Sequence, residues 1–207
     1  CEVNMVGSIA CIGTNGNDFI EIFATISFTV ITNDGNDTVD FSGSGNITTT
    51  GIDEPAVNNG GGDVNLTDGQ IMTSGESSDA IRDFGTGSAT NTSTSITTNG
   101  DFADGIQESG DGDATNVNAI STNGDSAHAI NESGNGSATN KGIIVTTGDN
   151  SEGIVENGVG DATNEDTIQV TGGSNSDGVN ESGPGAATNT FGANIVIDNP
   201  GGIGVLE

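Results

Sequence analysis

The chain has 207 residues, of which 30 are Asp or Glu and only two are Lys or Arg, so its net charge at pH 7 is −28. Nucleic acid is excluded as a partner, because no basic surface is available to replace the counterions of phosphates. The charge favours divalent cations as partners and keeps isolated molecules apart unless it is screened. Seven Phe without Trp or Tyr would make a poor globular core. Such a composition is also typical of disorder, but the strict aliphatic repeat described below argues against it.

The N-terminus suggests a processed, exported protein. The chain begins at Cys1 and shows no charged leader and no membrane-spanning helix, as expected of a mature form. Cys1 and Cys11 are the only cysteines, and their closeness in sequence predicts a disulfide formed in an oxidising compartment. A lipidated Cys1, which would leave Cys11 free, is the alternative. We therefore expect a secreted protein, extracellular or at the cell surface.

Residues 1–63 do not keep the period of the later repeats, and residues 19–31 are the most apolar run of the chain. The alternation of β-branched and aromatic residues in this run predicts one or two strands. Because the end of a stack of strands exposes an unpaired edge, residues 1–63 are predicted to be a β-rich segment for capping or assembly. The residues expected at an intermolecular joint are Phe19, Ile20, Ile22, Phe23, Ile26, Phe28, Val30, Ile203 and Val205.

Two Gly, Asn and Asp-rich segments flank the apolar run, at residues 13–21 and 32–40. They resemble the nonapeptide of RTX calcium-binding β-rolls, in which turn carbonyls and an Asp bind calcium and the next aliphatic residue enters the core. This resemblance implies that Asp18 and Asp37 are Ca²⁺ ligands. Each segment lacks one or two of the family's glycines, and the apolar run separates the two copies, which the family has in tandem. Two ordinary Asn-Gly turns are the alternative.

From about residue 64 to residue 207, the sequence repeats every 24 or 25 residues. Each repeat contains three short alternating segments separated by glycine turns, and its many Gly, Thr, Ser, Asn and Asp residues exclude helical repeats. A fixed period of this length is typical of a solenoid, in which each unit must stack on its neighbour to bury an apolar face. We predict an all-β fold: a parallel β-helix, or β-solenoid, with about 24–25 residues and three short strands per coil.

The alternation within each segment assigns the interior, because successive side chains of a strand point to opposite sides. The central aliphatic column and the asparagine of each Ala-Thr-Asn tripeptide are predicted to point inward. Stacked asparagines can hydrogen-bond from coil to coil, which avoids a cost of about 1–3 kcal/mol for each unpaired amide. A simple preference of Asn for turns is the alternative. The predicted core ladder comprises Ile81, Ile106, Ile130, Ile154, Val179, Asn91, Asn116, Asn140, Asn164 and Asn189.

Stacking also converts repeated acids into rows. One row is Asp83, Glu108, Glu132, Glu156 and Glu181, and a second is Glu76, Asp101, Asp125 and Asp149. Like charges about 4.8 Å apart repel by about 1 kcal/mol even in water, so either cations or backbone amides must neutralise them. We expect turn amides at the first row. At the second row we expect Ca²⁺, bound by Asp101, Asp125 and Asp149, with solvated surface acids as the alternative.

No residue is predicted to be catalytic. Enzymes with β-helical folds act on polysaccharides through clustered carboxylates, usually with Arg or Lys nearby, but this chain has only Arg82 and Lys141. His128 occupies a position that is acidic in the other repeats, and we expect it on the surface. No position breaks the repeat as an active site would, so we expect a protein that is not an enzyme.

The pattern Ile-x-Thr-x-Gly, Gly-Ile or Ala-Ile, then Gly-x-Gly-x-Ala-Thr-Asn resembles the β-helical passenger domains of bacterial autotransporter adhesins. The resemblance implies a released passenger or a separately exported subunit. Our leading hypothesis is an exported subunit that binds copies of itself head-to-tail, in a filament or surface layer. The second is an adhesin passenger that binds a host or matrix surface, including surface glycans. The third is an ice-binding solenoid, based on Thr columns at Thr73, Thr98 and Thr122 and at Thr90, Thr115, Thr139, Thr163 and Thr188.

Overall fold

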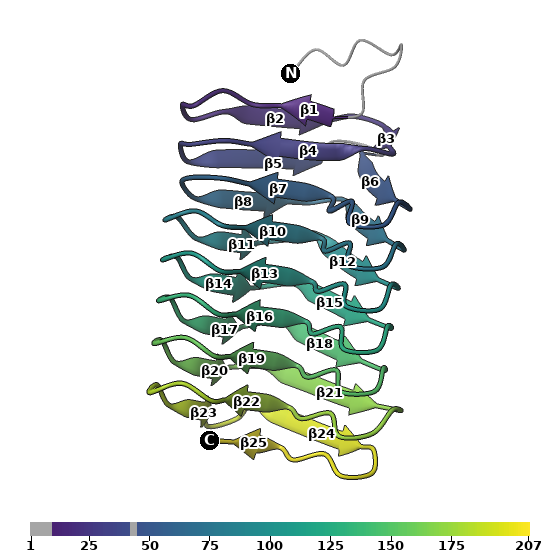
Figure 1. Ribbon diagram of the computed structural model, residues 1–207, viewed down its shortest axis with the longest axis vertical. Helices are drawn as coiled ribbons and strands as arrows, with labels where there is room; N and C mark the ends of the chain where they lie inside the picture. The colour runs from purple at the N-terminus through teal and green to yellow at the C-terminus, as the bar shows by residue number, and fades with distance from the viewer. Residues whose placement is uncertain (1–9, 42–44) are drawn as a thin grey trace.

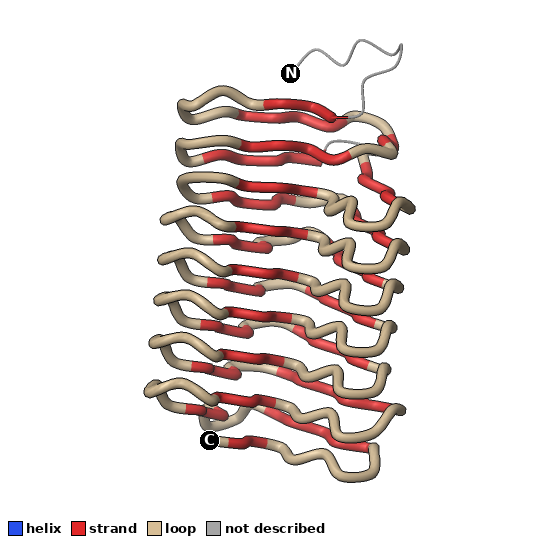
Figure 2. Tube along the Cα trace, in the orientation of Figure 1, coloured by secondary structure: helices blue, strands red, loops and turns tan. Residues whose placement is uncertain are grey.

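The computed structural model describes residues 10–41 and 45–207. Over these residues it is all-β and contains no helix (Figures 1 and 2). The chain winds into a stack of coils that contribute strands to three parallel sheets, so the prediction of a parallel β-solenoid is confirmed. Cys1 lies outside the described residues, and so does its predicted disulfide with Cys11.

Each sheet runs along the stack and takes one strand from successive coils. Sheet A contains β1 (Ala10–Ile12), β4 (Thr29–Thr32), β7 (Val57–Asn59), β10 (Ile81–Asp83), β13 (Ile106–Glu108), β16 (Ile130–Glu132), β19 (Ile154–Glu156), β22 (Val179–Glu181) and β25 (Val205–Leu206). Sheet B contains β2 (Phe19–Ile22), β5 (Asp37–Phe41), β8 (Val64–Thr67), β11 (Ala89–Asn91), β14 (Ala114–Asn116), β17 (Ala138–Asn140), β20 (Ala162–Asn164) and β23 (Ala187–Asn189). Sheet C contains β3 (Thr25–Ile26), β6 (Asn46–Thr49), β9 (Gln70–Thr73), β12 (Ser95–Thr98), β15 (Ala119–Thr122), β18 (Ile143–Thr146), β21 (Thr167–Thr171) and β24 (Asn194–Asp198).

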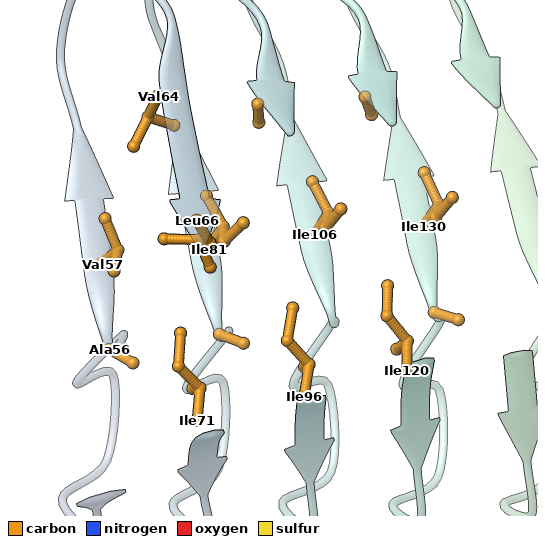
Figure 3. Close-up of a cluster of buried hydrophobic side chains, with 14 of the residues drawn as sticks. Ala56, Val57, Val64, Leu66, Ile71, Ile81, Ile96, Ile106, Ile120 and Ile130 are labelled. Atoms are coloured by element: carbon orange, nitrogen blue, oxygen red, sulfur yellow. The ribbon is translucent and has the colours of Figure 1, made fainter. Parts of the chain in front are cut away.

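The interior is a narrow apolar core formed by side chains from all three sheets. Ile81 aligns with Ile106 in sheet A, Ala89 with Ala114 in sheet B, and Ile96 with Ile120 in sheet C. The side chains of these columns are buried and converge between the sheets (Figure 3). Because like side chains stack on like side chains, the small core is filled mainly by aliphatic residues, and Phe41 is the aromatic residue buried in its described part.

Two backbone features allow the coils to stack closely. A Cβ atom at Gly110 would lie 1.6 Å from the carbonyl oxygen of Gly85 in the preceding coil, so only glycine fits this turn. The turn between sheets C and A uses a left-handed residue in every repeat, including Phe102 with φ 57°. The other non-glycine residues of this column are Asp53, Ser77, Ser126, Asn150 and Asn175.

The described part of residues 1–63 joins the same three sheets, and no break in the sheets marks residue 63. Ala10 aligns with Thr29 and Val30 aligns with Val57, so the first of these spacings is shorter than the later repeat and the second is longer. Strand β5 pairs directly with β8 of the repeat region. These coils therefore differ from the later ones in the lengths of their turns, while their strands stack in the same way.

The apolar run of residues 19–31 does not form the one or two strands that its alternation predicted. It forms β2, β3 and most of β4, which belong to three different sheets. Short turns at Phe23 and Ser27 interrupt the run, and strand-like alternation alone does not reveal such corners. The run thus supplies most of the first described coil.

Candidate functional site

An asparagine ladder lies inside the stack along the end of sheet B. Asn91 Nδ2 donates to Asn116 Oδ1 at 2.9 Å, Asn116 donates to Asn140 at 2.9 Å, and Asn140 donates to Asn164 at 2.9 Å. Asn164 donates to Asn189 at 2.7 Å, and Asn189 is the exposed last rung. The coil-to-coil hydrogen bonding predicted from the sequence is therefore present, and the ladder satisfies amides that would otherwise be buried without partners.

A second polar column lies inside the stack at the end of sheet A. It begins with Thr32, whose hydroxyl donates to Asn59 Oδ1 at 2.7 Å, and Asn59 Nδ2 donates to Asp83 Oδ2 at 2.8 Å. Carboxyl side chains then follow in register, and all of them are buried. These five residues, here called the carboxyl column, are Asp83, Glu108, Glu132, Glu156 and Glu181.

Each carboxyl of this column is held by the glycine turn that follows it. Glu108 Oε1 accepts from the main-chain N–H of Gly110 at 2.5 Å, and Glu132 Oε1 accepts from Gly134 at 2.7 Å. The same bond joins Asp83 to Gly85, Glu156 to Gly158 and Glu181 to Gly183. Turn amides therefore hold the first acidic row, as predicted. The Oε2 atoms of its four glutamates are buried and meet no N–H or hydroxyl donor among the described residues.

Burial raises the pKa of every member of the carboxyl column. Loss of hydration is the largest cause, and it raises the pKa of Glu108 to about 8 and that of Glu181 to about 7. It also raises the pKa values of Asp83, Glu132 and Glu156. The charge of Glu132 also raises the pKa of Glu156, and that of Glu156 raises the pKa of Glu181. Because burial and neighbouring carboxylates both disfavour the charged form, the column retains protons at a pH where exposed carboxyls are ionised.

The second acidic row lies on the surface and also meets backbone amides. Asp101 Oδ1 accepts from the N–H of Asp125 at 3.0 Å, and Asp125 Oδ1 accepts from the N–H of Asp149 at 2.9 Å. Asp149 Oδ1 accepts from the hydroxyl of Ser174 at 3.1 Å. In residues 10–41 and 45–207, no group of three or more His, Cys, Asp or Glu side chains is arranged to hold a metal. The calcium prediction for this row therefore has no geometric support here and stays a prediction.

Asp18 and Asp37 lie in adjacent coils and are connected through the backbone. Asp37 Oδ1 accepts from the N–H of Asp18 at 2.8 Å. Asp18 Oδ2 accepts from the N–H of Thr14 at 2.5 Å and from its hydroxyl at 2.9 Å. Asp37 is fully buried, and this burial raises its pKa. Both side chains thus stabilise turns.

His128 is mostly buried, so the expectation of a surface position is wrong. Its side chain is 19% exposed, and Nδ1 lies 2.6 Å from Glu152 Oε2. Asp104 and Glu152 on the neighbouring coils raise the pKa of His128, although its burial acts in the opposite direction. Arg82 similarly contacts Asp79 at 2.7 Å and Asp53 at 2.6 Å. Both residues serve the stack by pairing with acids between coils.

The two Thr columns face opposite ways. Thr73, Thr98 and Thr122 are fully buried in sheet C, and their hydroxyls have no partner among the described residues. The column that begins at Thr90 faces outward from sheet B. The two columns therefore cannot form one flat threonine surface.

The residues predicted for an intermolecular joint are divided between core and surface. Ile20, Ile22 and Val30 are buried in their own coil. Phe19 and Phe23 are 64% and 66% exposed. Ile26 and Phe28 are partly buried, and Ile203 and Val205 are exposed in the last coil.

The fold places the chain in the class of β-solenoid repeat proteins. A comparison with protein-family models, with curated proteins and with solved structures finds no match. No helix in the described part of the chain is long and apolar enough to cross a membrane.

Proposed function

We propose that the protein is an exported structural subunit that self-assembles head-to-tail into an extracellular filament or surface layer. The observation that carries this proposal is the uncovered core of the last coil. Ile168, Val170 and Val179 are fully buried, whereas Ile195 and Ile197 in the next coil are only partly buried, and Val205 is 38% exposed. A further coil stacked on this end would bury these side chains and pair the free edge of β24.

The direction of the strands suits an open fibre. All strand pairs in the three sheets are parallel, with β1, β2 and β3 at one end and β25, β23 and β24 at the other (Figure 1). The first coil of a second copy could therefore continue each sheet in the same direction. Contact between unlike ends does not close on itself and generates a filament.

At the N-terminal end of the stack, the burial of the side chains in the apolar run determines what this run would contribute to a joint between copies. Ile20, Ile22 and Val30 are already part of the core, so β2 would contribute its main-chain edge. Ile26 and Phe28, which are partly buried, would contribute apolar contact to Ile195 and Ile197 of the next copy. This pairing of a free edge with apolar side chains is the mode of β-strand addition.

Electron microscopy and sedimentation of two matched variants test the proposal. Ile195→Asp places a charge on the uncovered core and should abolish fibres. Thr188→Asp lies on the adjacent strand β23 and faces solvent, so fibres should persist. Circular dichroism should show that both variants keep their β-structure, because each coil depends on its nearest neighbours. Fibres formed equally by Ile195→Asp would refute head-to-tail stacking at this end.

Deletion of residues 1–31 tests the opposite end of the stack. We expect a folded solenoid that no longer forms fibres, since the deletion removes β1, β2, β3 and most of β4 while the later coils keep their neighbours. Persistent fibres would show that the joint lies elsewhere.

An adhesin passenger that binds a host or matrix surface is the second candidate. The outward hydroxyl column on sheet B, from Thr90 to Thr188, favours it because a regular row of hydroxyls can hydrogen-bond surface glycans. Binding of the purified chain to an array of glycans, compared with a Thr139→Lys variant, would test this function. Compact single rods that bind glycans would favour it over the filament.

A further inference from the structure

The outer face of sheet C carries almost no charge, although the chain has a net charge of −28. Its inward residues are the Ile and Thr columns of the core, so the alternate residues of each strand face outward. Asp198, at the end of β24, is the one charged residue among the outward positions of these described strands. The uncharged outward residues are Thr25, Asn46, Thr48, Gln70, Met72, Ser95, Thr97, Ala119, Ser121, Ile143, Val145, Thr167, Gln169, Thr171, Asn194 and Val196.

The two halves of this face differ in surface shape. The half formed by β3, β6, β9 and β12 contains a hollow of about 230 Å³, lined by Asn46, Gln70, Met72 and Thr97 among others. The other half carries exposed aliphatic side chains, with Ile143 52% and Val196 42% exposed. A recess and a set of projecting aliphatic groups therefore occupy opposite halves of one sheet.

The two halves of sheet C contain the same number of strands. Sheet C runs β3-β6-β9-β12-β15-β18-β21-β24, so its midpoint falls between β12 and β15. A two-fold axis parallel to the strands at this midpoint would lay β9 of one copy on β18 of another. Met72 would then meet Val145, and Gln70 at the hollow would meet Ile143. The small residues Ser95, Thr97, Ala119 and Ser121 would lie at the axis, where the two sheets approach most closely.

We propose that two copies of this chain pair face to face through sheet C, about a two-fold axis between β12 and β15. Such a contact is self-complementary, because each residue pair occurs twice. It is independent of head-to-tail stacking, since it uses a side of the solenoid and leaves both ends free.

The charge distribution selects a second copy as the occupant of this face. Packed sheets lie about 10 Å apart, and Coulomb interactions are largely screened beyond about 8 Å at physiological ionic strength. The acidic rows on the turns are the main source of repulsion between copies, and a contact through sheet C buries no row of acids. We therefore expect the pairing to strengthen as salt concentration rises.

The size of the face predicts a weak dimer. Eight strands span about 35 Å, and the four residues of a strand span about 13 Å, so the contact would bury roughly 900 Å² in total. Stable complexes bury at least about 1200 Å², and smaller contacts are typical of transient complexes. The dimer should therefore depend on protein concentration.

Sedimentation equilibrium of the full chain with two matched variants tests the pairing. Ser121→Glu places two unpaired charges beside the axis and should weaken association about tenfold or more. Thr115→Glu lies in the same coil, but it faces outward from sheet B, and association should be unchanged. Circular dichroism should show that both variants are folded. Association that Ser121→Glu leaves unchanged, or a wild-type chain that stays monomeric at high concentration and salt, would overturn the proposal.

Cross-linking tests the register. Under oxidation, a chain carrying both Met72→Cys and Val145→Cys should form covalent dimers well above the level of the unsubstituted chain, which has its own cysteines. Met72→Cys alone should not form them, because the axis places residue 72 of one copy far from residue 72 of the other copy. Equal cross-linking by Met72→Cys alone would show that like strands face each other, and no cross-linking by the double variant would also overturn this arrangement.

Discussion

The side-chain amide of Asn59 donates a 2.8 Å hydrogen bond to Asp83 Oδ2 from the neighbouring strand of sheet A. This contact marks a change of chemistry along one interior column. On the N-terminal side, the Thr32 hydroxyl and the Asn59 amide already contain the hydrogen atoms that they donate, so their hydrogen bonds do not require protonation. On the C-terminal side, the column from Asp83 to Glu181 consists of carboxyls, which must take up protons before they can donate hydrogen bonds. The stability of that part of the stack is therefore linked to pH.

The first prediction concerns pH and the whole carboxyl column. The folded pKa of Glu108 is raised to about 8 and that of Glu181 to about 7, above the value of about 4.3 for an unfolded Glu. The folded state therefore binds more protons than the unfolded state, so stability is full below about pH 4 and is lost as pH rises through 7 to 8. We expect melting to occur several degrees lower at pH 9 than at pH 5, since 1 kcal/mol corresponds to about 2–4 °C in a chain of this size. An equal or higher melting temperature at pH 9, measured by circular dichroism, would contradict the prediction.

The second prediction isolates one rung of the column. Glu132→Gln keeps an oxygen for the N–H of Gly134 and replaces a titrating hydroxyl with an amide donor. The unfolding free energy should then depend less steeply on pH between 5 and 9, because the variant lacks one carboxyl whose pKa is raised by burial. Urea unfolding at several pH values measures this slope. Asp125→Asn, in the exposed row of a neighbouring turn, should leave the slope nearly unchanged. An unchanged slope in Glu132→Gln would mean that this residue binds no proton on folding.

The third prediction concerns the asparagine ladder. Asn140→Ala removes the acceptor of Asn116 and the donor to Asn164, which are both buried. We expect a loss of about 1–3 kcal/mol for each buried group left without a partner, measured by urea unfolding. Thr139→Ala is the matched control on the same strand, because this side chain faces outward, and its effect should lie within about 0.5 kcal/mol. Equal effects of the two changes would show that the ladder does not stabilise the fold.

The fourth prediction compares an inward with an outward position. Ile130 is fully buried in sheet A, whereas Thr115 is half-buried on the outer face of sheet B. Ile130→Asp places a charge in the apolar core and should cost several kcal/mol, unfolding the coils around it. Thr115→Asp should cost little. Unchanged melting of Ile130→Asp would contradict the burial of this column.

The fifth prediction concerns calcium. If Ca²⁺ bridges the exposed acids, a chelator at low ionic strength should lower the melting temperature, because the unscreened rows would repel along the stack. Combined substitution of Asp101, Asp125 and Asp149 by Asn should abolish this sensitivity. Substitution of Asp18 and Asp37 would test the N-terminal segments separately. Since Asp101 and Asp125 already accept backbone hydrogen bonds, indifference to the chelator would assign these rows to backbone amides alone.

The repeat pattern alone was enough to predict the solenoid, its coil length and the inward columns of residues 64–207. Period and alternation are local properties, and stacking identical units forces equivalent residues such as Ile106 and Ile130 into contact. The asparagine ladder and the amides that hold the acidic row follow from the same regularity. The N-terminal coils were harder to predict, because their turns vary in length and break the fixed period. The period therefore does not reveal that β5 and β8 pair in one sheet.

Only the tertiary structure decided the environment of particular side chains. His128 shares its column with acids that alternation places near the surface, but its side chain is only 19% exposed and lies against Glu152 of the next coil. The sequence shows Glu108 and Glu132 in one row, yet it does not show that the glycine turns fold over that row and exclude water. Burial and pKa depend on the packing of neighbouring coils. A periodic pattern predicts which side of a strand each side chain faces, but it does not predict how deeply that side chain is buried.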